Sequence, residues 1–99
     1  MSAESKACHD EEEAEQVVRD GMKCLHLKES ELKTTVGSDP RKVAIAHAVH
    51  QKTAVARRWT AARLGMKSAM NVCQQIKRLK TEKLNLPKEV KRWLSRIDA

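Results

Sequence analysis

Four polar side chains between residues 71 and 78 have the types and the spacing with which proteins read DNA bases. They are Asn71, Gln74, Gln75 and Arg78. Intervals of three, one and three residues place them on one face of a helix. Asn and Gln can bond adenine through two hydrogen bonds, and Arg can do so with guanine, which gives about 1–3 kcal/mol of base discrimination for a good pair. We therefore predict that this face makes base contacts.

Basic and hydroxyl side chains surround these four positions and could bind the phosphates of a DNA backbone. Phosphate contacts fix the position of a protein on the duplex but do not read its sequence. The three arginines of this set lie on or beside the preceding helix, where they would hold the backbone on that side of the groove. The predicted backbone contacts are Arg57, Arg58, Arg63, Lys67, Ser68, Lys77 and Lys80.

A helix-turn-helix at about residues 54–80 would position both sets of contacts. Such a motif needs a small residue in its first helix, a turn residue that tolerates a left-handed backbone, and apolar anchors on its second helix. Ala61, Gly65 and the pair Val72 and Ile76 fill these roles. The interval from Gly65 to Val72 is one residue longer than in the commonest form, which predicts a slightly wider turn. The core-facing stripe of the second helix is predicted to be Ala69, Val72, Cys73, Ile76 and Leu79.

The charge of the chain is divided unevenly along its 99 residues, although the net charge is +7. Residues 1–32 hold nine acidic and four basic residues, and residues 33–99 hold sixteen basic and four acidic residues. The net charges of the two parts are thus −5 and +12. A basic surface of this size attracts polyanions, of which nucleic acid is the commonest. The plainer interpretation is a solvated basic face without a partner.

The composition favours an all-α fold. Tyr and Phe are absent, whereas residues with high helix propensity are abundant. We expect a disordered acidic N-terminus at residues 1–9 and a single helical DNA-binding domain at residues 10–99. Asp39 and Pro40 form a typical helix start, Thr53 can cap the next helix, and Gly65 ends it. The five predicted helices span residues 10–27, 40–52, 54–64, 68–80 and 87–97.

No pattern of catalytic residues is present, so we expect no enzymatic activity, no cofactor and no metal. His47 and His50 share a helix face but lack a third ligand, because Cys73 is predicted to face the core. We interpret both histidines as core or partly exposed residues. Trp59 and Trp93 are interpreted as core anchors, since base stacking would need them exposed.

The sequence contains no targeting or membrane signal that we recognise. Its three cysteines form no close pair, which argues against a disulfide framework or a zinc site. No apolar run approaches the ~18–20 residues that a membrane span needs. No signal-peptide pattern follows Met1. We expect a cytoplasmic, nucleoid-associated protein without a membrane partner.

About thirty residues of the basic part resemble a known family in order and spacing. The chain is similar to the C-terminal helical region of REP-associated tyrosine transposases and their bacterial relatives, over about two-thirds to three-quarters of its length. The family pattern has a "G-D-P-x-K-x-x-x-A" helix start, a Thr, and "W-I-A-x-R-L-x-M-G" with "V-S" shortly after. The matching residues here are Ser38-Asp39-Pro40-Arg41-Lys42-Val43-Ala44-Ile45-Ala46, Thr53, Trp59, Ala61-Ala62-Arg63-Leu64-Gly65-Met66 and Asn71-Val72.

The chain departs from this family at three motif positions and lacks its catalytic machinery. Thr60 stands where the family has Ile, Lys67 replaces the Gly after Met66, and Cys73 replaces the Ser after Val72. The family's His-hydrophobic-His metal motif and its nucleophilic Tyr have no counterpart. The resemblance therefore implies an accessory DNA-binding part, with duplex or hairpin DNA and a separate catalytic transposase chain as partners. A truncated gene, a domesticated remnant and an independent regulator all stay open.

Two other functions remain as alternatives. A helical protein-interaction module would be favoured by an apolar patch left exposed around Trp93 and Leu94. Binding of an RNA hairpin by the same basic face would be separated from DNA binding by competition between the two nucleic acids. The acidic run Glu11–Glu13 could also fold back on the basic face and weaken non-specific DNA binding.

Overall fold

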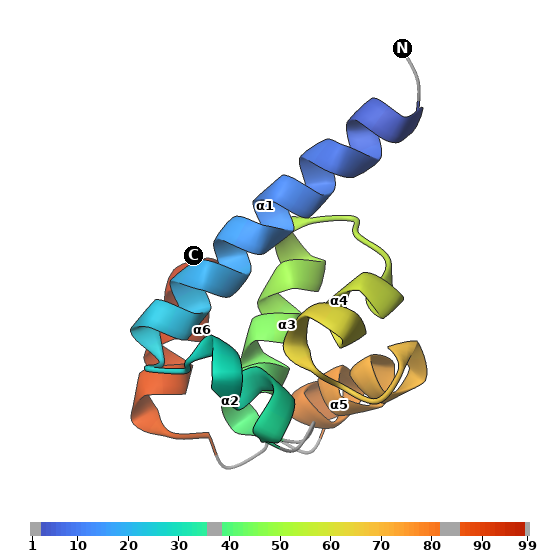
Figure 1. The fold of residues 1–99 in the computed structure, drawn as a ribbon. Helices are drawn as coiled ribbons and strands as arrows, with labels where there is room; N and C mark the ends of the chain where they lie inside the picture. The colour runs from blue at the N-terminus through green and yellow to red at the C-terminus, as the bar shows by residue number, and fades with distance from the viewer. Residues whose placement is uncertain (1–2, 36–38, 82–85, 99) are drawn as a thin grey trace.

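A computed structural model describes the backbone of residues 3–35, 39–81 and 86–98, and the side chains of residues 10–35, 39–80 and 86–97. Within these ranges the chain forms six helices and no strand, which confirms the all-α prediction (Figure 1). None of the described helices combines the length and the apolar character that crossing a membrane requires. The helices are α1 (Ala3–Cys24), α2 (Glu29–Thr34), α3 (Pro40–Lys52), α4 (Arg57–Leu64), α5 (Ala69–Thr81) and α6 (Lys88–Asp98).

Two differences from the predicted helices lie in the N-terminal third. The predicted number of five is wrong because residues 29–34 form the short helix α2, where the Glu31 carboxylate accepts a hydrogen bond from the Lys28 amide at 3.2 Å. Helix α1 begins at Ala3, within the residues 1–9 for which we expected disorder. Residues with high helix propensity there can extend a helix that packing already stabilises. Residues 1–2 lie outside the described part.

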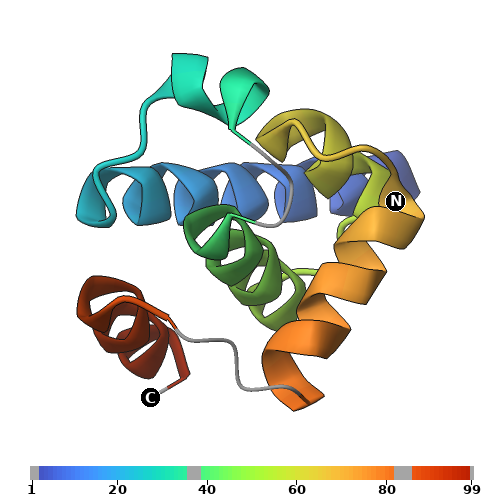
Figure 2. The same cartoon turned by 90° about the horizontal axis from the view of Figure 1, so that it is seen from below.

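Helix α3 forms the centre of the molecule and packs against α1, α4, α5 and α6. Figure 2 shows it between α5 and α6. Every residue from Lys42 to Val49 is buried, which accounts for its mostly apolar sequence. The predicted start is confirmed: Pro40 occupies the first turn, and the Asp39 carboxylate accepts a hydrogen bond from the Arg41 amide at 2.9 Å. Ser38, the first residue of the motif that resembles the transposase family, lies outside the described residues.

Gly21 lets α1 pack closely on α3 and α6. A Cβ atom at this position would lie 2.7 Å from Cγ1 of Ile45 and 3.0 Å from the ring of Trp93. Trp93 is buried, and its Nε1 donates a hydrogen bond to Oδ2 of Asp20 at 2.9 Å. The interpretation of Trp93 as a core anchor is therefore confirmed. A larger residue in place of Gly21 would push apart the helices that enclose the core.

A tight connection through Gly65 joins α4 to α5. Gly65 has φ 67° and ψ 34°, in the left-handed region, and ends α4 as expected. Ser68 precedes α5, and its hydroxyl oxygen accepts a hydrogen bond from the main-chain N–H of Asn71 at 3.2 Å. Ala61 and Val72 are buried in the same core cluster. Ala61 and Val72 are thus buried, whereas Ile76, the second predicted anchor, is half-buried.

The start of α4 differs from the prediction. It begins at Arg57 rather than at Ala54, and Ala56 at its N-cap makes no side-chain hydrogen bond. Thr53 caps the end of α3 instead, where its hydroxyl donates to the carbonyl oxygen of Val49 at 2.8 Å. A threonine between two helices can cap the end of the first or the start of the second, and here its hydroxyl caps the end of the first.

Candidate functional site

The solvent-facing side of α5 carries a continuous row of side chains, which we call the outer face of α5. Intervals of three, one, three and one residues align them along the helix. Met70 begins the row. Its large apolar side chain is 71% exposed to solvent. The outer face of α5 consists of Met70, Cys73, Gln74, Lys77 and Arg78, all of them exposed.

This face is rotated from the one that the sequence predicted. Gln75 is only 8% exposed, so the expectation that it faces solvent is wrong, and Cys73 is exposed rather than in the core. Asn71 is half-buried. The side-chain amide oxygens of Asn71 and Gln75 are both enclosed and have no hydrogen-bond partner among the described residues. Because α5 packs against both α3 and α4, the side of the helix that carries Asn71 and Gln75 is covered.

The predicted base contacts are thus brought together only in part. Gln74 and Arg78 remain exposed on the outer face of α5, but Gln75 is not accessible to a base. Asn71 cannot present its carbonyl oxygen for a two-bond contact with adenine, because that oxygen is enclosed. Met70 also belongs to the outer face of α5, but the sequence analysis did not include it. An apolar residue in a helix is usually interpreted as part of the core. The one available signal was that Met70 lies off the predicted core stripe.

Six of the seven predicted phosphate contacts are exposed. Arg57 and Arg58 lie in the first turn of α4, and Lys67 and Ser68 lie in the connection to α5. Lys77 and Lys80 lie on the second half of α5. No aspartate or glutamate occurs in the sequence between Asp39 and Glu82, so α3, α4 and α5 carry no carboxylate of their own. Their surface is positive except where other elements approach it.

Arg63 is the exception, and its placement corrects the prediction. Its guanidinium donates to the Glu15 carboxylate at 2.6 and 2.8 Å and to the Glu29 carboxylate, with one of these contacts at 3.2 Å. These bonds raise the pKa of Arg63 and hold the pKa of Glu15 below its usual value. Arg63 therefore ties α4 to α1 and α2 and is not available to a phosphate. The partners lie 48 and 34 positions away in the sequence, which is why no local pattern revealed them.

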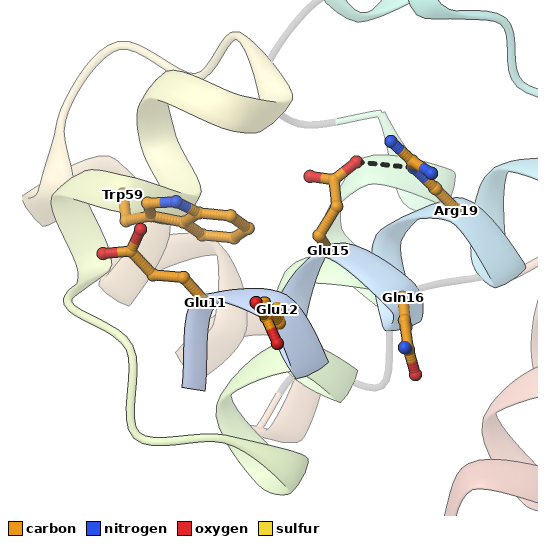
Figure 3. Close-up of a pocket in the computed structure, with 6 residues that line it drawn as sticks. All are labelled: Glu11, Glu12, Glu15, Gln16, Arg19 and Trp59. Carbon is orange, nitrogen blue, oxygen red and sulfur yellow. Dashed lines mark hydrogen bonds and ion pairs between the residues drawn. The ribbon is translucent and has the colours of Figure 1, made fainter. Parts of the chain in front are cut away.

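The side of α4 that faces α1 is acidic. Glu11, Glu12 and Glu15 line a pocket with Trp59, and Figure 3 shows the Glu11 side chain on the Trp59 side of this pocket. Trp59 is half-buried and packs against the core. Arg19 partly neutralises the pocket, since its Nε donates to Glu15 at 3.0 Å. A polyanion would be repelled here, so α4 could receive a phosphate backbone only from its other side.

That other side contains a basic cleft between α3, α4 and α5, which we call the α3–α5 cleft. Its walls include His47, His50, Gln51, Arg57, Lys77 and Lys80, and none of the lining residues that the structure describes is a carboxylate. His50 is half-buried, and its Nε2 lies 2.9 Å from the hydroxyl oxygen of Thr60. Burial and the nearby charge of Arg57 lower the pKa of His50. His47 is buried, so both histidines are core or partly exposed residues as predicted.

No protein-family model, curated protein or solved structure matches this chain. Among the described residues, no three His, Cys, Asp or Glu side chains come together as a metal site would require. Function is therefore inferred from the residues themselves and from their geometry.

Proposed function

We propose that this chain binds duplex DNA through α4 and α5, with α5 lying in the major groove as the second helix of a helix-turn-helix. The observation that carries this proposal is the exposed row of polar and cationic side chains on α5, in a stretch of sequence without a carboxylate between Asp39 and Glu82. An α-helix fits the major groove, and cations beside it neutralise phosphates.

The connection between the two helices supports this arrangement. In a helix-turn-helix the second helix crosses closely over the first, and a short turn, often with a glycine, separates them. Gly65 is in the left-handed conformation, the small residue Ala61 of α4 is buried, and α4 packs against α5. The N-terminal part of such a second helix contacts base edges. Met70 and Gln74 lie in that part of α5.

The base contacts we propose are those that remain exposed. Gln74 can bond adenine and Arg78 can bond guanine, while Met70 can make an apolar contact with the methyl group of thymine. Arg57, Arg58, Lys67, Ser68, Lys77 and Lys80 would bind phosphates. The sequence resemblance to the helical region of REP-associated tyrosine transposases supports the same role, with a separate catalytic chain as a further partner.

The observation that would have favoured a protein-interaction module is missing from the described part of the chain. Trp93 is 2% exposed, and Leu94 is half-buried against the core. The last helix therefore covers the core of this molecule and does not offer an apolar patch at these residues. RNA-hairpin binding stays as the competing outcome, to be separated by competition with duplex DNA.

Fluorescence anisotropy of the full chain with a labelled random duplex, between about 50 and 200 mM salt, tests the proposal. We expect log affinity to fall linearly with log salt, with a slope of about −0.9 for each neutralised phosphate. The double variant Arg58→Gln/Lys67→Gln should bind more weakly and lower the slope by about two units, because each phosphate contact contributes about one.

The matched control removes two charges from α6, which lies on the other side of α3 from α5 (Figure 2). Lys88 and Lys91 are exposed there, so Lys88→Gln/Lys91→Gln should leave the slope nearly unchanged. Equal effects of the two double variants would overturn the assignment to α4 and α5. No binding at 50 mM salt would overturn DNA binding itself, and tighter binding of a hairpin RNA would replace it with RNA recognition.

A further inference from the structure

The α3–α5 cleft has features that reading DNA bases does not explain. Base contacts need a convex helix face, whereas this cleft is a hollow beside that face with walls from three helices. Arg57 comes from α4, and Lys77 and Lys80 come from α5. Helix α3 contributes His47 and His50, and no carboxylate occurs among the described residues that line the hollow.

We propose that the α3–α5 cleft is a binding site for a phosphate group. Cations that converge on one hollow from different helices stabilise an anion more than the same charges spread over a convex surface, because several can reach it at once. The guanidinium of Arg57 can donate two parallel hydrogen bonds to phosphate oxygens, and the ammonium groups of Lys77 and Lys80 can approach as point charges.

The wall of the cleft that α3 provides is held in place before any ligand arrives. Thr60 is fully buried and contacts Nε2 of His50 at 2.9 Å, which fixes the plane of the imidazole. The His50 imidazole and the Arg57 side chain line the same cleft. A preorganised wall reduces the entropy that binding must overcome.

Binding of a phosphate in the cleft should change the pKa of His50. The charged groups that share the cleft with His50 are Arg57 of α4 and Lys77 and Lys80 of α5, with His47 on its own helix. Burial and the charge of Arg57 disfavour the protonated imidazole. A bound phosphate offsets these charges, so the pKa of His50 should rise on binding.

Two sources could supply the phosphate: the backbone of a bound duplex, or a free phosphorylated small molecule. The probe for their shared chemistry is pyrophosphate, titrated into the full-length chain while the histidine ring resonances are followed by NMR. We expect a saturable shift of the His50 resonances and a rise in its pKa. No saturable shift up to about 10 mM pyrophosphate, which corresponds to a very weak interaction, would overturn the proposal.

Neighbouring residues provide matched variants, since one of each pair lines the cleft and the other does not. Arg57→Gln should weaken pyrophosphate binding at least about fivefold, and Arg58→Gln less than about twofold, because both lose one charge but only one loses a contact. Lys77→Gln and Arg78→Gln form a second pair with the same expectation, which protects the test if one variant fails to fold. Equal weakening within both pairs would show general attraction of anions and overturn a specific site.

Competition with labelled duplex distinguishes the two sources and separates this inference from DNA binding. If a backbone phosphate occupies the cleft, pyrophosphate should displace the duplex from the wild-type chain but not from Arg57→Gln at the same concentration. If a free ligand occupies it, pyrophosphate should bind without displacing the duplex. Saturable pyrophosphate binding by a chain that does not bind duplex would support the cleft and overturn only the proposed function.

Discussion

A buried hydrogen bond joins the side chain of Lys42 to the main-chain carbonyl oxygen of Leu32. The same ammonium group donates to the carbonyl oxygen of Thr35 at 2.8 Å, and Lys42 has no exposed surface. Both acceptors lie at the end of α2, where the last carbonyl groups have no partner within the helix. Burial lowers the pKa of Lys42, while the Asp39 carboxylate acts in the opposite direction. A charged residue of the central helix thus completes the end of α2.

Replacing this lysine should destabilise the fold. Lys42→Met leaves two main-chain acceptors without their donor, which we expect to lower the free energy of unfolding by about 3 kcal/mol. Urea denaturation followed by circular dichroism measures the loss. Lys52→Met is the control, because Lys52 is an exposed lysine of the same helix and its replacement should change stability by less than about 0.5 kcal/mol. Similar losses in the two variants would contradict the role of Lys42.

Gly65 should tolerate no side chain, for a reason that goes beyond its backbone conformation. A Cβ atom there would lie 2.1 Å from the carbonyl oxygen of Leu32. Gly65→Ala should therefore cost more than the about 1–2 kcal/mol that a left-handed residue costs by itself. Asn adopts the left-handed conformation more readily than Ala, so strain from φ alone would be relieved in Gly65→Asn. We expect no such relief in thermal unfolding, and recovery in Gly65→Asn would show that conformation alone matters.

The ion pair between Arg63 and Glu15 should make stability depend on pH in the acidic range. The folded state lowers the pKa of Glu15 below 4.5, through its hydrogen bonds with Arg63 foremost. This contribution is therefore fully present above pH 4.5 and is lost as the pH falls through the folded-state pKa. Arg63→Met should cost about 2 kcal/mol at neutral pH, and its difference from wild type should shrink toward pH 3.

The control for this pH dependence is Arg58→Met, which removes an exposed arginine from the same helix. Its effect on the free energy of unfolding should be small at every pH, because exposed charges contribute little. Urea denaturation at several pH values measures both variants. A difference between Arg63→Met and wild type that does not change with pH would show that the stability comes from packing of the Arg63 stem.

Arg78 and Lys77 should affect DNA binding in different ways. Once a preferred site has been selected from random duplexes, Arg78→Ala should relax specificity at one base pair by about 1–3 kcal/mol. Lys77→Ala should weaken binding to all sequences about equally, as the loss of a phosphate contact does. Anisotropy titrations on a panel of single-base changes measure both effects. A uniform loss in both variants would remove the assignment of base reading to Arg78.

The acidic residues at the start of α1 should weaken non-specific DNA binding. Glu11 and Glu12 line the pocket beside Trp59 on α4, and Glu13 follows them on the exposed surface. Deleting residues 1–13 or replacing Glu11–Glu13 by Gln should tighten DNA binding at about 50 mM salt, on the order of fivefold for the substitution, and the gain should fade as salt screens the charges. Glu89→Gln on α6 is the control acid, and unchanged affinity in the triple variant would contradict this effect.

The fold class and some of the helix ends could be predicted from local residue preferences. The all-α fold, the capped start at Asp39 and the left-handed end at Gly65 depend on the preferences of a few adjacent residues. Thr53 shows where such reasoning is ambiguous, because its hydroxyl could serve either neighbouring helix and local preference did not decide between them. The division of charge along the chain also required only the sequence, since it is a property of composition.

Tertiary packing decided which side chains the site contains. The sequence placed Gln75 outward and Cys73 inward, and the reverse holds because α3 and α4 together cover a different strip of α5 than its most apolar stripe suggested. The carboxylates that bind Arg63 come from α1 and α2. The α3–α5 cleft is lined by residues of three helices. Local residue preferences thus predicted the all-α class, the left-handed turn residue and the division of charge. The tertiary structure decided the exposed face and the ion pairs, because these depend on contacts between residues far apart in the chain.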